Sequence, residues 1–127
     1  MNSIVHFEIP VDDSEKAKKF YTEAFGWGIR TDKMPNGKDY NSVTTAPTDE
    51  NFTPKNPGAI NGAIIQRDSK LKSPVITVSV DSVEEAIKKI EASGGKVITP
   101  KATLEGMGDY AYIADPAGNI IGLWHNL

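Results

Sequence analysis

The sequence predicts an α+β protein built from two tandem βαβββ modules, and two observations carry this prediction. A pattern near the N-terminus returns about halfway along the chain, where Val5–Ile29 aligns with Pro74–Ile98. Each copy has alternating apolar and polar residues, followed by apolar residues at helical spacing. Because a copy of about 60 residues is small for an independent core, we expect one structural domain over residues 1–127, with modules at about 1–68 and 72–127.

Each copy opens with a predicted strand that has one apolar face. In the first copy, the apolar positions are Val5, Phe7 and Ile9, which alternate with His6 and Glu8. In the second copy, the apolar set is Ile76, Val78 and Val80, and it alternates with Val75, Thr77 and Ser79. Side chains of a strand point to opposite faces in turn, so His6 and Glu8 share one face, as do Thr77 and Ser79.

A helix is predicted after each of these strands. Asp12 with Glu15, and Ser82 with Glu85, have the spacing of an N-cap residue and its capping-box partner. The predicted buried faces consist of Ala17, Phe20, Tyr21 and Ala24 in the first helix, and of Val83, Ala86, Ile87 and Ile90 in the second. Gly26 and the Gly94-Gly95 pair are expected to end the two helices in left-handed conformations.

Six further strands complete the two modules. They are predicted at Gly28–Lys33, Asp39–Ala46, Ile60–Gln66, Lys96–Pro100, Asp109–Ala114 and Asn119–Trp124. Turns or loops are expected at Pro35-Asn36-Gly37, at Leu104–Gly108 and at Asp115–Gly118. The polar, proline-rich segment Pro47–Pro57 is predicted to be a surface loop or a mobile flap.

The composition excludes several classes of function. The net charge is −3, and no basic run suggests a nucleic-acid partner. The chain has no cysteine, which excludes disulfides, thiolate metal sites and a cysteine nucleophile. Neither a signal peptide nor a long apolar run is visible, so we expect a cytoplasmic protein with no membrane partner.

Two strings give the chain a family resemblance. V-D-D-S-E-K-A-K-K-F-Y-T-E-A-F-G-W begins at Val11, and A-D-P-A-G-N-I-I-G-L-W begins at Ala114. Together with the paired βαβββ units, they resemble the vicinal oxygen chelate superfamily of glyoxalase I, bleomycin-resistance proteins and extradiol dioxygenases. The resemblance covers nearly the whole chain. It implies a glyoxalase-like fold in which a curved eight-stranded sheet surrounds a cavity, and it implies a homodimer.

The resemblance also implies positions for metal ligands, on the first and last strands of each module. They fall on His6 and near Gly62 in module one, and on Val75 and on or beside Gly122 in module two. A divalent ion needs several nitrogen or oxygen donors, which valine and glycine side chains lack. His125 is expected to point away from the face that Gly122 and Trp124 share. We therefore predict no tightly bound metal or other cofactor, with one divalent ion as the alternative.

The candidate ligand-binding residues are His6, Glu8, Tyr40, Asn61, Thr77, Ser79, Tyr110 and Trp124. Polar residues on cavity-facing strands favour a binding cavity over a filled core. Each residue also has a structural interpretation: His6 and Glu8 can bond neighbouring strands, and the tyrosines and Trp124 can pack in the core. A catalytic residue is not identified.

The predicted function is that of a metal-free glyoxalase/bleomycin-resistance-like protein that binds a small organic molecule in the cavity between its modules. Two alternatives stay open. One is a metal-dependent lyase or isomerase of the lactoylglutathione lyase type, in which His6, Glu8 and water or a partner subunit hold the ion. The other is a regulatory module with a vestigial cavity. One fold supports many activities, so the fold does not choose among these.

Overall fold

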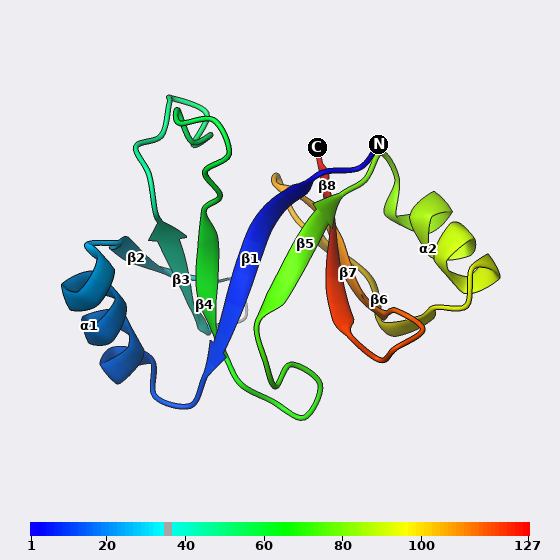
Figure 1. Cartoon of the computed structure of the whole chain (residues 1–127), viewed down its shortest axis with the longest axis horizontal. Helices are drawn as coiled ribbons and strands as arrows, with labels where there is room; N and C mark the ends of the chain where they lie inside the picture. Colours follow the sequence, from blue (N-terminus) through cyan, green and yellow to red (C-terminus); the bar gives the residue numbers. More distant parts are fainter. Residues whose placement is uncertain (35–36) are drawn as a thin grey trace. The chain divides into compact units, whose positions relative to one another are not determined.

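The computed structural model describes residues 1–34 and 37–127. In these residues the chain forms eight strands and two helices. In chain order they are β1 (Ile4–Val11), α1 (Ser14–Phe25), β2 (Gly28–Lys33), β3 (Asp39–Thr44), β4 (Gly62–Gln66), β5 (Val75–Ser79), α2 (Val83–Ala92), β6 (Lys96–Leu104), β7 (Gly108–Ala114) and β8 (Ile120–Asn126). The predicted α+β class with two βαβββ modules is confirmed (Figure 1).

The chain divides into two compact units. Module one is His6–Pro74, and module two is Val75–Leu127 together with the N-terminal segment Met1–Val5. The N-terminal segment joins module two partly through the Ser79 N–H, which donates to the Ser3 carbonyl oxygen at 2.9 Å. That all residues form one structural domain stays a prediction.

The two modules have the same strand order and the same strand directions. In module one the order is β2-β3-β4-β1, with β1 parallel to β4 and the other neighbours antiparallel. In module two the order is β6-β7-β8-β5, with β5 parallel to β8 and the other neighbours antiparallel. The repeat seen in the sequence is therefore also a repeat of strand topology. Glu8 in module one and Thr77 in module two occupy equivalent positions, as do Tyr40 and Tyr110.

The core of module two lies between α2 and one face of its sheet. Val83 of α2 is buried there, and Ala86, Ile87 and Ile90 pack against the same cluster, as predicted. The sheet contributes Val80, Ala111, Ile113 and Leu123. Ser82 caps the helix by accepting from the Glu85 N–H at 3.2 Å, and Gly94 has a φ of 96° just beyond its end. The opposite face of this sheet, without the helix, is called the open face of module two.

Helix α1 differs from the prediction at its start. The cap is Asp13 and not Asp12: Asp13 has extended backbone angles, and its side chain accepts from the Lys16 N–H at 3.1 Å. The Asp12 carboxylate instead pairs with Arg67 at 2.6 Å. The predicted end is confirmed, because Gly26 has a φ of 69° and donates its N–H to the Thr22 carbonyl oxygen.

The predicted buried face of α1 is wrong in part. None of the helix's residues, all of which the structure describes, is buried, and Phe20 is 56% exposed. Ala24 is exposed as well. The aromatic side chains instead pack on one another: Tyr21 stacks on Trp27 with ring centroids 5.0 Å apart, and Phe20 meets Tyr21 edge-on. Aromatic pairs of this kind stabilise a helix end without full burial.

Several strand ends also differ from the predictions. Strand β6 continues past Pro100 to Leu104, with register irregularities that absorb the proline, and β8 continues to Asn126. The turn at Asp115–Gly118 is confirmed by the Gly118 N–H, which donates to the Asp115 carbonyl oxygen at 2.9 Å. At the predicted hairpin turn after β2, Pro35 and Asn36 lie outside the described residues.

The predicted surface loop at residues 47–57 is largely exposed. Its Asp49 carboxylate accepts from the Asn51 and Thr53 N–H groups, and Phe52 projects with 77% exposure. Neither helix that the structure describes has the length and apolar character that crossing a bilayer requires.

Candidate functional site

The open face of module two carries two rows of side chains that the strand register brings together. One row runs across β5, β8, β7 and β6 and consists of Ser79, Trp124, Tyr110 and Ala102. The next row consists of Thr77, Gly122, Tyr112 and Thr99. Four of the predicted site residues therefore lie on one face, namely Thr77, Ser79, Tyr110 and Trp124. The rings of Tyr110 and Tyr112 meet edge-on, 6.1 Å apart.

Trp124 is held in a fixed orientation on this face. Its indole N–H donates to the Asn126 side-chain oxygen, and its six-membered ring lies over Gly108, where a Cβ atom would come within 2.7 Å of it. The indole therefore leans away from Gly122, and its N–H is not available to a ligand. His125 points to the other face, as predicted, with its Nδ1 atom 3.1 Å from the Val80 carbonyl oxygen.

Thr77 is the most deeply buried polar side chain on the open face of module two, with 6% exposure. Its hydroxyl lies over Gly122, because a Cβ atom at Gly122 would come within 2.7 Å of it. Within the described part of the chain, this hydroxyl forms no hydrogen bond. No fully buried polar atom lacks a partner there, so the Thr77 hydroxyl must border accessible space.

In module one, the face of the sheet opposite Phe7 carries ionisable side chains. His6 and Glu8 project from β1 on the face opposite Phe7, and the register through Ala63 and Ser42 places Tyr40 on their side of the sheet. Glu8 is 7% exposed. Burial, and after it the negative charge of Glu8, raises the pKa of Tyr40 well above its usual range. This face can therefore hold or exchange protons with a bound molecule.

Burial lowers the pKa of the His6 imidazole below its ordinary value of 6.5. Unfolding exposes the ring, so between the folded pKa and 6.5 the unfolded state binds more protons. Stability is therefore expected to fall as pH drops through this window. Replacing His6 with glutamine removes this titration. Denaturant unfolding at neutral and mildly acidic pH should show a smaller acid-induced loss for H6Q than for the unchanged protein, whereas equal losses would contradict the expectation.

Asn61 serves a local structural role. Its side-chain oxygen accepts from the Thr45 N–H at 2.8 Å and lies 3.3 Å from the Thr45 hydroxyl, which donates to the Ile60 carbonyl oxygen. These bonds tie the segment after β3 to the segment before β4. Whether Asn61 also contacts a ligand stays a prediction.

Sequence reasoning missed the roles of Gly108 and Asn126, which together set the position of Trp124. It treated Gly108 as part of a loop. The alternation along β7 carries the missing signal, because it places Gly108 two residues before Tyr110, on the same face.

The metal positions implied by the resemblance do not fit a divalent ion. Val75 and Gly122 offer no donor atom, and the Thr77 hydroxyl already occupies the space into which a side chain at Gly122 would extend. At Gly62, a Cβ atom would lie 2.3 Å from the Phe7 carbonyl oxygen. Among residues 1–34 and 37–127, no three His, Asp or Glu side chains are grouped so that they could hold an ion. His6 alone remains of the implied set.

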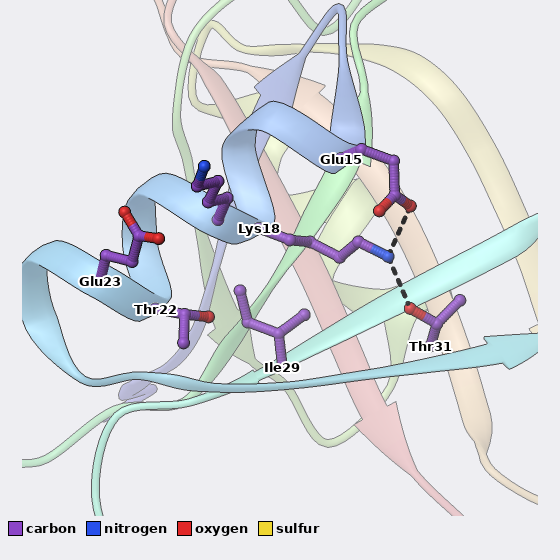
Figure 2. Close-up of a pocket in the computed structure, with 7 residues that line it drawn as sticks. Glu15, Lys18, Thr22, Glu23, Ile29 and Thr31 are labelled. Carbon is purple, nitrogen blue, oxygen red and sulfur yellow. Dashed lines mark hydrogen bonds and ion pairs between the residues drawn. The ribbon is translucent and has the colours of Figure 1, made fainter.

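A groove of about 370 Å³ lies elsewhere, between α1 and β2 (Figure 2). Lys18 projects across it and contacts Glu15 at 2.8 Å and the Thr31 hydroxyl at 3.3 Å. The groove is shallow and open, Lys18 is already paired, and none of the predicted site residues lines it. We do not regard it as the functional site.

Comparison with known proteins shows the family. The profile described as Glyoxalase/Bleomycin resistance protein/Dioxygenase superfamily matches residues 3–123. The chain belongs to this superfamily, as the two sequence strings predicted. It is 31% identical over 121 residues, or 92% of its length, to proteins named "Putative glyoxylase CFP32" from Mycobacterium tuberculosis and Mycobacterium bovis. The chain spans 43% of the length of these relatives.

Solved structures share the fold. The hypothetical protein BH1468 from Bacillus halodurans C-125 matches with a TM-score of 0.69 at 14% identity, covering 99% of this chain and 95% of that one. Methylmalonyl-CoA epimerase from Streptomyces coelicolor, in complex with 2-nitronate-propionyl-CoA, matches with a TM-score of 0.69 at 15% identity, covering 97% and 96%. At these identities the likeness establishes the glyoxalase-like fold and nothing finer.

Proposed function

We propose that this protein binds a small organic molecule with a flat, apolar part on the open face of module two. The observation that carries the proposal is the neighbourhood of Gly122, where an unpartnered threonine hydroxyl and three aromatic side chains share one face of a sheet. Aromatic rings on one face suit a planar group, and a few placed hydroxyls orient it. The bound molecule of the Streptomyces epimerase shows that the fold can accept a small organic molecule.

The two tryptophans of the chain allow a direct test. Trp27 belongs to module one and stacks on Tyr21, whereas Trp124 lies on the proposed site. Replacing Trp27 with phenylalanine leaves Trp124 as the only tryptophan, and replacing Trp124 with phenylalanine leaves Trp27. We expect phenol and toluene, titrated separately, to change the indole fluorescence of W27F in a saturable manner and to leave that of W124F unchanged.

Excitation at the red edge of the indole absorption avoids the absorption of the probes. Circular dichroism of both variants serves as the control for folding. A saturable change in W124F alone would place binding in module one and overturn the proposal. If the fluorescence changes in neither variant and the probes do not raise the melting temperature, the alternative of a regulatory protein with a vestigial cavity is favoured.

A lyase or isomerase remains a second candidate, because Glu8 is a buried carboxylate on the same face as His6 and Tyr40. A buried carboxylate of this kind is suited to proton transfer at a substrate carbon. The names of the relatives, a glyoxylase and an epimerase, agree with this candidate. Metal analysis of protein purified without a chelator or tag separates the candidates: stoichiometric divalent metal that is lost in H6A would favour the metal-dependent enzyme.

We further propose that the protein acts as a homodimer, as the family resemblance implies, and its mass by light scattering would test this. The cytoplasmic location also stays a prediction.

A further inference from the structure

Thr77 offers the one recognition point on the open face of module two that is both buried and without a partner among the described residues. Its side chain is 6% exposed, and its hydroxyl borders accessible space above Gly122. Gly122 in turn allows this position, since any side chain there would displace the hydroxyl. A hydroxyl that borders accessible space can bond to water or to a bound group, and a ligand that covers it without a polar atom leaves it unsatisfied.

Within module two, the two rows of the open face around Thr77 carry no carboxylate, amine, guanidinium or imidazole side chain. The two rows of the open face contain Ser79, Trp124, Tyr110, Ala102, Thr77, Gly122, Tyr112 and Thr99, and none is Asp, Glu, Lys, Arg or His. The nearby charged residues of β6 and β7, Lys101 and Asp109, are paired with each other and with Glu84 of α2. A charged group bound against Thr77 would lose its hydration and find no opposite charge in these two rows.

We infer that Thr77 selects an uncharged hydrogen-bonding group, such as a hydroxyl, carbonyl or amide, on a planar aromatic ligand that binds against the Thr77 side chain on the open face of module two. Thr77 is then a specificity-determining residue. This inference rests on the proposed function and adds to it the chemical class of the ligand. The family resemblance places a metal-binding side chain on or beside Gly122. In this chain the neutral Thr77 hydroxyl occupies that space and faces the ligand.

The experiment compares four probes of similar ring size on the W27F protein: phenol, toluene, benzoate and benzylammonium. Toluene lacks the hydrogen-bonding group, and the other two carry a negative or a positive charge. We expect phenol to bind at least about tenfold more tightly than benzoate and benzylammonium. Adding Thr77→Val, which keeps the shape and removes the hydroxyl, should weaken phenol binding by about two- to tenfold and leave toluene binding unchanged.

Thr77→Ser is the matched control, because it keeps the hydroxyl and should retain the preference for phenol over toluene. Circular dichroism confirms that both variants fold. Equal effects of Thr77→Val on phenol and toluene, or tightest binding of a charged probe, would overturn the inference while the proposed function stood. If none of the four probes changes the fluorescence of W27F, the proposed function itself fails.

Discussion

Replacing Gly62 with alanine is expected to lower the free energy of unfolding by about 3 kcal/mol. A Cβ atom at this position would lie 2.3 Å from the Phe7 carbonyl oxygen and 2.7 Å from the Phe7 ring. Phe7 is the register partner of Gly62, so the backbone oxygen cannot retreat without opening the pairing of β1 with β4. Denaturant unfolding of the variant measures the loss.

Gly28→Ala is the matched control for Gly62→Ala. Gly28 is also a strand glycine, and the nearest atom to its added Cβ would be the Thr44 Cβ at 3.8 Å, an ordinary contact. We expect G28A to change stability by less than about 0.5 kcal/mol. Equal losses in the free energy of unfolding for the two variants would contradict the expectation that a Cβ atom at Gly62 is crowded. The expected loss also bears on function, because the same crowding excludes a metal-binding side chain from this position.

Replacing Ile64 with alanine is expected to destabilise the protein by about 3 kcal/mol. Ile64 is 1% exposed and lies in β4, between Ile9 of β1 and Asn41 of β3. Removing its outer carbons loses buried apolar contacts and leaves a cavity that the three paired strands cannot readily close. Thermal or denaturant unfolding measures the change.

Ile76→Ala provides the comparison for Ile64→Ala. Ile76 is a strand isoleucine as well, but it is 43% exposed. The same deletion there should cost less than about 1 kcal/mol, since much of the side chain already contacts water. If Ile76→Ala proved as costly as Ile64→Ala, the assignment of Ile64 to the interior of module one would be wrong.

The sequence predicted the faces of the strands well, because strand alternation depends only on local geometry. Thr77 and Ser79 lie on one face, Gly122 and Trp124 of the neighbouring strand lie on the same face, and His125 points away from it. The register that brings these strands together comes from long-range pairing, which no local pattern encodes. The rows on the open face were therefore beyond prediction, although four of their members, Thr77, Ser79, Tyr110 and Trp124, were candidate site residues.

The errors arose where neighbouring residues compete for one role. Asp12 and Asp13 are both suitable helix caps, and the ion pair of Asp12 with Arg67, distant in sequence, leaves Asp13 to cap the helix. Phe20 fits a buried helical face by spacing, but its partners are other aromatic rings at the surface. Asn61 has a local role that the sequence did not predict, because its oxygen joins two chain segments, and its contact with a ligand stays a prediction. In each case the deciding contact is tertiary.

The close approach of Thr77 to Gly122 has a consequence for engineering a metal site into this sheet. A carboxylate side chain at position 122 would displace the Thr77 hydroxyl, because both would otherwise occupy one space. Introducing a metal-binding residue at this strand would therefore also move the hydroxyl that the proposed ligand contacts.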